Sequence, residues 1–273
     1  EVISADSMQV YRGLDVGAAK PSPEVRSRVP HHLIDILDPR QQYTAGEFVH
    51  RAEELIPQIE LRGRIVVISG GTAYYFRNFI YGLPETPAAN PAVRKQLEER
   101  LEAEGLSSLY AELNRLDPLA GEGISPRDTY RILRGLEVYY ATGRPLSSFP
   151  VPKNPRLNRP YRLIGLMRDR EELYKRIDVR VEEMFHQGLP EEVARLISCG
   201  YGEQDPGMRG IGYREFLQLG RLGCLTLSQV KAQIQKDSRR YAKRQITFFK
   251  SLPDVQWIHP DSIRSLADLG ICL

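Results

Sequence analysis

The sequence contains few cysteines and no long apolar run. Its three cysteines, Cys199, Cys224 and Cys272, stand far apart without a Cys-x-x-Cys pair. This spacing argues against a disulfide framework or a structural zinc site and favours a reducing compartment. No stretch approaches the ~18 apolar residues of a membrane span, and no signal peptide is visible. We therefore expect a cytoplasmic protein without membrane association, most simply a monomer.

The net charge is only +3, so the overall composition does not indicate nucleic-acid binding. Apolar residues make up 41% of the chain and charged residues 27%, as in ordinary globular proteins. A length of 273 residues suits one large domain or two of ordinary size.

The first eleven residues predict a strand that ends in a polar turn. Val2 and Ile3 are β-branched, and residues 4–7 follow as the turn. In open α/β sheets, ligands bind beyond the carboxyl ends of the strands. Asp6 therefore stands where a catalytic base or a metal-binding carboxylate is expected, although such a turn is also common in proteins without that role.

The next segments alternate between strand and helix patterns. We expect a strand at 31–36, an amphipathic helix at 45–61 and a buried strand at 65–69. Lys20, in a loop between glycine and prolines, is interpreted as solvated rather than phosphate-binding, and the pair His31-His32 lacks the further ligands of a metal site.

A Gly-Gly-Thr turn at 70–72 follows the 65–69 strand and precedes an aromatic helix at 73–81. Two glycines permit close approach of a ligand, and Thr72 is a candidate N-cap. The exposed N–H groups of a helix start attract anions. A plain tight turn is the alternative.

From residue 83 to about 155 the pattern changes to consecutive helices without strands. One begins at Asn90-Pro91, a second covers 107–116, and a third opens with residues 125–128 and runs to Gly143. Arg127, Arg131 and Arg134 near one face of the third helix suit contact with a phosphate backbone or, alternatively, a solvated charged face.

Beyond this insertion, residues 161–167 return to a strand pattern. The next helix opens at Asp169 with Glu172 in a capping-box arrangement. Arg168 and Arg170 flank its start, where guanidinium groups can grip a diphosphate, or they are simply surface arginines. Residues 255–259 predict a last short strand.

The strongest charge asymmetry lies at 231–250, where seven basic residues stand against the single acid Asp237. Tyr241, Phe248 and Phe249 interleave with these charges. Basic and aromatic side chains together favour a nucleic-acid groove over an ordinary amphipathic helix.

Taken together, these residues resemble those of the tRNA dimethylallyltransferases, the bacterial type of tRNA isopentenyltransferase. The resemblance covers nearly the whole chain. It rests on six blocks in the family's order: ISADSMQVY at 3–11, GAAKP at 17–21, GGT at 70–72, RILRGLEV at 131–138, RGIGYR at 209–214 and RYAKRQIT at 240–247.

The resemblance implies an α/β fold with a P-loop-kinase-like parallel sheet flanked by helices and an inserted all-helical domain. The core would comprise residues 1–83 and 156–273, and the insertion, 84–155, would contact tRNA. The implied reaction transfers a dimethylallyl group from dimethylallyl diphosphate to N6 of the adenosine 3′ to the tRNA anticodon, with Mg²⁺.

By the same resemblance, Asp6 is the general base, Thr72 lies near the bridging oxygen of the diphosphate, and Arg170 is catalytic. Thr72, Arg168 and Arg170 are the expected diphosphate ligands, and no protein metal ligand is expected. The implied contacts to the tRNA anticodon stem-loop are Asp6, Ser7, Met8, Gln9, Arg94, Tyr130, Arg131, Ile132, Leu133, Arg134, Arg209, Gly210, Ile211, Gly212, Tyr213, Arg214, Lys243, Arg244, Gln245, Ile246, Thr247, Phe248, Phe249 and Lys250.

The sequence departs from the family pattern in three places. The family's P-loop, expected just before Glu1, does not occur in the sequence, and we expect the chain as printed to lack activity that an upstream P-loop segment restores. Ala73-Tyr74 replaces the usual Gly-Leu, and Tyr130 replaces a glutamine that usually precedes Arg131.

Three other functions compete. An adenylate isopentenyltransferase acting on free nucleotides would need neither the basic segment nor the insertion. A non-catalytic tRNA-binding remnant would bind RNA without forming product. A small-molecule kinase would depend even more on the P-loop.

Overall fold

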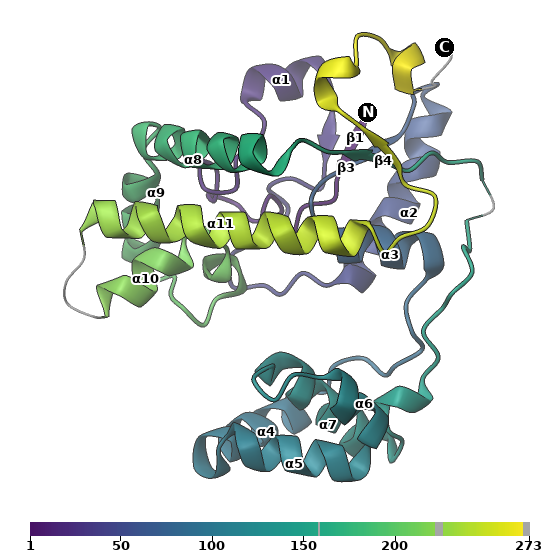
Figure 1. Ribbon diagram of the computed structural model, residues 1–273, viewed down its shortest axis with the longest axis vertical. Helices are drawn as coiled ribbons and strands as arrows, with labels where there is room; N and C mark the ends of the chain where they lie inside the picture. The colour runs from purple at the N-terminus through teal and green to yellow at the C-terminus, as the bar shows by residue number, and fades with distance from the viewer. Residues whose placement is uncertain (158, 222–225, 270–273) are drawn as a thin grey trace. The chain divides into compact units, whose positions relative to one another are not determined.

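The computed structural model describes residues 1–157, 159–221 and 226–269. The chain divides into two compact units: unit 1 is Glu1–Phe79 with Asn158–Leu273, and unit 2 is Ile80–Leu157. Every strand of the described residues belongs to unit 1, whereas unit 2 consists of helices and their connections (Figure 1). The predicted α/β class with inserted helices is confirmed.

Two small parallel sheets form the β-structure of unit 1. In the first, β1 (Val2–Ser4) lies between β2 (His31–His32) and β3 (Val67–Ser69). In the second, β4 (Ile164–Leu166) pairs with β5 (Gln256–Ile258). Because parallel strands end at the same edge of their sheet, the turns after β1 and β3 lie together.

Seven α-helices of the described residues lie wholly or mainly in unit 1. They are α1 (Pro23–Arg28), α2 (Ala45–Leu61), α3 (Ala73–Tyr81), α8 (Arg170–His186), α9 (Leu189–Ser198), α10 (Arg214–Gly220) and α11 (Leu227–Phe249). Short 3₁₀ turns occur at η2 (Pro206–Arg209), η3 (Pro260–Ser262) and η4 (Leu266–Leu269). The two long helices α8 and α11 pack side by side (Figure 1).

The helix predicted at 45–61 is confirmed with the same bounds. Thr44 and Glu47 form a reciprocal capping box at its start. Its buried residues Phe48, Ala52 and Ile56 recur at helical spacing, which places the apolar face of α2 in the core.

The prediction that residues 65–69 form a buried strand is wrong. β3 covers only Val67–Ser69, and the side chains of Ile65 and Val67 are 45% and 44% exposed. Within the described residues β3 pairs with β1 alone and is an edge strand, so its apolar run is not enclosed on both sides. The strand predicted at 31–36 is also shorter, because Leu33 and Asp35 have positive φ angles of 64° and 58°.

Unit 2 contains α4 (Pro91–Glu104), α5 (Leu106–Leu116), α6 (Pro118–Gly123), α7 (Thr129–Thr142) and the 3₁₀ turn η1 (Leu146–Ser148). Its core is a cluster of buried aliphatic side chains: Leu97, Leu109, Leu113, Ile132, Leu133 and Leu136. The sequence did not predict α6. The third predicted helix begins at Thr129, after the N-cap Asp128, rather than at residue 125.

None of the helices in residues 1–157, 159–221 and 226–269 is both long and apolar enough to cross a membrane.

Candidate active site

Asp6 is held by its own turn at the carboxyl end of β1. Its Oδ1 accepts the backbone N–H groups of Met8 at 2.7 Å and Gln9 at 3.2 Å. Its other oxygen, Oδ2, makes no hydrogen bond to any described residue. Two N–H donors on one oxygen fix the carboxylate in the turn and leave the second oxygen available for a ligand.

The Gly-Gly-Thr turn after β3 is joined directly to the Asp6 turn. The Thr72 N–H donates to the Ala5 carbonyl at 3.1 Å, and the Ser7 N–H donates to Thr72 Oγ1 at the same distance. The Thr72 hydroxyl therefore binds the Asp6 turn, whereas the sequence had suggested that it caps α3.

Gly70 and Gly71 allow this close approach. A Cβ on Gly70 would lie 2.2 Å from the Ala5 carbonyl oxygen, and one on Gly71 would lie 2.3 Å from Gln245 Nε2. Gln245 Nε2 donates to the Gly71 carbonyl at 2.7 Å, which ties α11 to the same turn. Gly70 has no room for a side chain because its neighbours are main-chain atoms, whereas a side chain on Gly71 would displace the Gln245 amide.

Tyr241, one turn before Gln245 on α11, also faces this site. Burial raises the pKa of the Tyr241 phenol, and the negative charge of Asp6 raises it further. The phenol therefore stays protonated near neutral pH and is a hydrogen-bond donor beside the carboxylate.

Two further motifs pack behind the Asp6 turn. A Cβ on Gly210 would lie 2.3 Å from the methyl carbon of Met8, and one on Gly17 would lie 2.5 Å from the Tyr213 ring. Motifs from 3–11, 17–21, 70–72, 209–214 and 240–247 therefore meet around one turn, although they are far apart in the sequence.

Several residues expected to contact tRNA are instead internal. The Tyr213 side chain is fully buried, as are Gly210 and Gly212. The Gln9 side chain accepts a hydrogen bond from Ser4 and donates to the carbonyls of Ala18 and Ala19. These residues support the turn. Of the 209–214 motif, Arg209 is exposed and Ile211 and Arg214 are half-buried, so these three are the residues that a ligand can reach.

Lys20 is neither solvated nor a free phosphate ligand, contrary to the sequence interpretation. Its side chain is only 4% exposed, and Nζ donates to the Tyr11 carbonyl and to the carboxylates of Asp15 and Asp35. Asp35 also accepts from Arg26 at 2.8 Å. This network fixes the 17–21 loop.

The Asp35 carboxylate predicts a stability change in acid. Burial by itself raises the pKa of Asp35, but the hydrogen bonds from Lys20 and Arg26 outweigh it and hold the pKa below its ordinary value. Because the pKa is lower in the folded protein, the ionised carboxylate stabilises the fold when the pH is above the unfolded-state pKa of about 4. This stabilisation is lost as the pH falls through the folded-state pKa.

Asp35→Asn should lower the free energy of unfolding at pH 7 by about 1–2 kcal/mol and flatten its decline below about pH 4. Thermal melts from pH 7 to pH 3 measure both effects. Asp15→Asn, at a carboxylate whose side chain is 56% exposed, should cost less. A decline as steep as that of the wild type would contradict the role of Asp35.

A cavity of about 500 Å³ lies beside the carboxyl ends of β4 and β5. Its lining residues are Met167, Arg168, Asp169, Arg170, Leu173, Tyr174, Lys243, Ile246, Thr247, Lys250, Trp257, Ile258 and His259. Asp6 and Thr72 are not among them, because Tyr241 and Gln245 face the two turns from another side of α11. The arginines predicted to bind diphosphate and several α11 residues predicted to contact tRNA therefore line the same cavity.

Arg168 and Arg170 differ in this cavity. Arg168 is 12% exposed and binds the carboxylates of Glu172 and Asp261. The predicted capping box at the start of α8 is wrong. Its N-cap, Asp169, makes no side-chain capping bond, and the Glu172 carboxylate binds Arg168 instead. Arg170 stacks over Tyr174 and has no carboxylate partner among the described residues. Arg170 is thus the freer cation for a phosphate.

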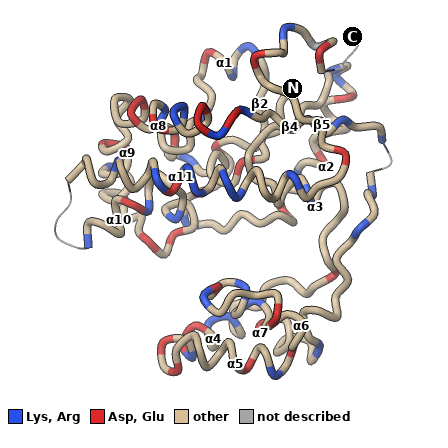
Figure 2. The backbone as a smooth tube through the Cα atoms, in the orientation of Figure 1, with Lys and Arg blue, Asp and Glu red and all other residues tan. Residues whose placement is uncertain are grey.

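Basic residues continue along α11 (Figure 2). In the first half and the middle of the helix, Lys231 pairs with Glu182 and Arg239 with Asp178, both on α8. The last turns differ, because Lys243, Arg244 and Lys250 have no carboxylate partner among the described residues. The aromatic Phe249 packs edge-on against Phe76, with ring centroids 5.7 Å apart, so its ring supports the fold.

In unit 2, the predicted RNA contacts divide into core and surface. Ile132 and Leu133 are buried in the hydrophobic cluster, and Arg134 donates to the Pro87 carbonyl at 2.6 Å and pairs with Glu137. These three side chains pack within unit 2, and their contact with tRNA stays a prediction. Arg127 lies before the start of α7, so the three arginines do not share one helix face.

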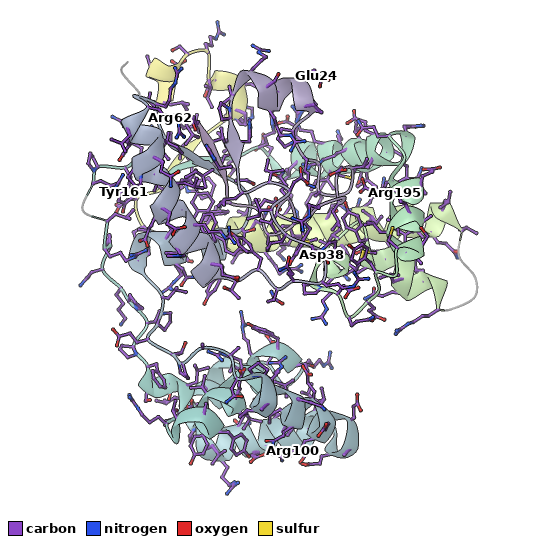
Figure 3. The ribbon with its side chains drawn as sticks, turned by 180° about the vertical axis from the view of Figure 1, so that it is seen from behind. Glu24, Asp38, Arg62, Arg100, Tyr161 and Arg195 are labelled. Carbon is purple, nitrogen blue, oxygen red and sulfur yellow. The ribbon has the colours of Figure 1, made fainter. Side chains whose placement is uncertain are left out.

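Arg94, Tyr130 and Arg131 remain on the surface of unit 2. The Tyr130 side chain is 69% exposed, and the Arg94 guanidinium lies 5.7 Å from its ring centroid. Arg94 also pairs with Glu98, and Arg131 with Asp128. Another arginine of this unit, Arg100, is bound by Glu104 and Glu112 (Figure 3).

No group of three or more His, Cys, Asp or Glu side chains in the described part of the chain is placed to hold a metal ion. Mg²⁺ is bound by oxygen ligands and often by one or two carboxylates together with substrate phosphates.

Sequence reasoning missed Glu192, which is buried in α9 and binds the 13–20 loop. Its position carried a signal: it falls on the apolar face of α9 formed by Leu189, Val193 and Leu196. Burying an unpaired charge is costly, so a glutamate on such a face is expected to have hydrogen-bonding partners.

The family model and the similar proteins point to the same family. The IPP transferase family model matches residues 9–252. A tRNA dimethylallyltransferase of Geobacter sulfurreducens is 41% identical over 274 residues, covering 99% of this chain and 88% of its own length. One from Borreliella burgdorferi is 40% identical over 261 residues, covering 96% of this chain and 85% of its own.

Solved structures agree. The full-length tRNA isopentenylpyrophosphate transferase of Bacillus halodurans matches with a TM-score of 0.67 and 35% identity, over 99% of this chain and 84% of that one. A eukaryotic dimethylallyltransferase acting on tRNA matches with a TM-score of 0.73 and 27% identity, over 96% and 68%. The predicted P-loop-kinase-like class is thereby confirmed, and the chain belongs to the IPP transferase family.

Proposed function

We propose that this protein transfers a dimethylallyl group from dimethylallyl diphosphate to N6 of the adenosine 3′ to the anticodon of tRNA. The proposal is carried by the Asp6 carboxylate, which is oriented by two backbone N–H groups and keeps one oxygen free beside Thr72 and Tyr241. Mg²⁺ remains a prediction from the resemblance.

In this reaction the adenine N6 forms a bond to the allylic carbon as the bond from that carbon to the diphosphate oxygen breaks. The N6 proton passes to Asp6 Oδ2, and diphosphate leaves. A carboxylate that accepts this proton as the bond forms lowers the barrier, because an adenine amino group is a weak nucleophile. The base must leave its stack to reach Asp6.

The test is mass spectrometry of an anticodon stem-loop RNA incubated with dimethylallyl diphosphate, Mg²⁺ and the protein. The RNA should gain the mass of one dimethylallyl group, and an RNA with guanosine in place of the target adenosine should gain none. The assay compares residues 1–273 with a version carrying an upstream P-loop segment, which tests the expectation drawn from the sequence.

The same assay separates the competing functions. AMP as acceptor should remain unmodified, and its prenylation would favour an adenylate isopentenyltransferase. Salt-sensitive RNA binding without product in either version would favour a binding remnant.

Arg170 should act on the diphosphate. Arg170→Ala should raise the KM for dimethylallyl diphosphate about tenfold or more, because a charge-assisted contact to phosphate is lost, with a smaller effect on stem-loop affinity. Steady-state kinetics measure this. Arg176→Ala, on the same helix but outside the cavity lining, is the control, and an equal effect there would argue against a specific role.

The helical unit should contribute RNA contacts through Tyr130 and Arg131. Base stacking on an exposed ring is worth about 1–3 kcal/mol, so Tyr130→Ala should weaken stem-loop binding about fivefold or more without changing its salt dependence. Arg131→Ala should instead reduce the slope of log K against log salt concentration by about 1.

Fluorescence anisotropy titrations over a series of KCl concentrations measure both quantities. Leu119→Ala, at another exposed apolar residue of unit 2, is the matched control and should change neither. A salt slope altered by Tyr130→Ala would contradict stacking.

A further inference from the structure

Glu192 binds four groups at once. Its Oε2 accepts the backbone N–H of Asp15 at 3.0 Å and of Val16 at 2.9 Å. Its Oε1 accepts the N–H of Gly17 at 3.2 Å and the hydroxyl of Tyr213 at 2.7 Å. Consecutive backbone N–H groups around a carboxylate form an anion nest, which compensates a charge that is otherwise costly to bury.

Tyr213 extends this arrangement by one residue. Its hydroxyl accepts the N–H of Ala18 at 3.1 Å while it donates to Glu192. Four successive N–H groups of the loop, from residue 15 to residue 18, therefore end on two buried side chains. Arg195, one turn after Glu192, adds a bond to the Gly13 carbonyl at 3.1 Å (Figure 3).

The other side of the same loop faces the Asp6 turn. The carbonyls of Ala18 and Ala19 accept from Gln9 Nε2 at 3.4 and 3.3 Å. Gln9 Oε1 accepts from Ser4 Oγ at 2.9 Å, and the Gln9 N–H donates to Asp6 Oδ1. A continuous chain of hydrogen bonds thus runs from α9 through the loop to the carboxylate.

We propose that Glu192 is a positioning residue, which holds the 15–18 loop so that Gln9 sets the orientation of Asp6. It lies 177 residues from Asp15 and outside every motif that indicated the family. The expected effect of Glu192 on the transfer rate rests on the proposed function, whereas its expected effect on the hydrogen exchange of the 15–18 loop does not.

Hydrogen exchange followed by mass spectrometry tests the proposal without activity. In Glu192→Gln, an amide replaces the carboxylate and two acceptor sites are lost. Exchange should rise at the amides of residues 15–18 and also at those of Met8 and Gln9, by about tenfold. Tyr213→Phe, the milder variant, should raise exchange at the same amides by less.

Val181→Ala is the matched control, because it removes buried volume from α8 in the same unit. It should lower the melting temperature while leaving exchange at residues 8–9 and 15–18 within twofold of the wild type. Two results would overturn the proposed link from Glu192 through Gln9 to Asp6, which we call the relay. One is a rise in exchange at these amides in Val181→Ala as large as that in Glu192→Gln. The other is a rise in Glu192→Gln that is confined to residues 15–18.

Single-turnover kinetics supply the second readout. Glu192→Gln should slow transfer about tenfold or more at saturating RNA, with the RNA dissociation constant changed less than threefold. In Gln9→Leu, where the relay is already broken, adding Glu192→Gln should slow transfer by less than twofold further. Additive effects would overturn the proposal. Absence of product from the wild type would count against the proposed function alone, since the exchange result stands independently.

Discussion

Asp6→Asn should abolish most of the transfer while leaving the fold and RNA binding intact. The amide retains an oxygen at the Oδ1 position, which can still accept the Met8 and Gln9 N–H groups. It cannot take the N6 proton. Loss of general-base catalysis is worth about 10²–10⁴-fold in rate, so kcat/KM should fall within that range.

The measurement is kcat/KM on the stem-loop RNA, with its dissociation constant and the melting temperature determined in parallel. Asp15→Asn is the matched control, because it makes the same chemical change at a carboxylate that is 56% exposed and lies outside the expected tRNA contacts. Full activity of Asp6→Asn, or an equal loss in Asp15→Asn, would remove Asp6 from the role of base.

Gly70→Ala should disrupt the site through its backbone. The added Cβ would lie 2.2 Å from the Ala5 carbonyl oxygen and 2.4 Å from its carbon. Both are main-chain atoms beside β1, so they cannot yield as a flexible side chain would. Steric conflict of this kind costs about 1–3 kcal/mol or more, and we expect loss of the Thr72–Ala5 and Ser7–Thr72 bonds.

Chemical denaturation measures the change in free energy of unfolding, and the transfer assay measures activity. Gly220→Ala is the matched control, because a Cβ there meets no atom of the described residues within 4 Å. It should change stability by no more than about 0.5 kcal/mol. A Gly70→Ala protein of native stability and activity would show that the two turns are not held by this close approach.

Much of the candidate site was predictable from short stretches of sequence. Asp6 follows a β-branched strand, and the Gly-Gly-Thr turn follows another, so both were expected at strand ends. The charge and ring pattern at 231–250 indicated the basic helix, although Phe249 turns out to pack inward.

Two features that the sequence did not show share a physical cause. The pattern at residue 20 predicts a solvated lysine, and the pattern at residue 168 does not indicate that this arginine has carboxylate partners, because a lysine or arginine in isolation prefers water. Lys20 is buried against Asp35, and Arg168 binds Asp261, which is 93 residues away. Local pattern does not report such partners.

By itself, the sequence determined the family blocks, the helix at 45–61, the Asn90 cap of α4 and the positions of the strands before Asp6 and Thr72, because these depend on residues within one or two turns of each other. Only the tertiary structure decided that β3 is an edge strand in the described chain, that Tyr213 is internal, and that Glu192 closes the 15–18 loop. Periodicity assigns a side chain to a face of its element, whereas the path of the whole chain decides what that face meets.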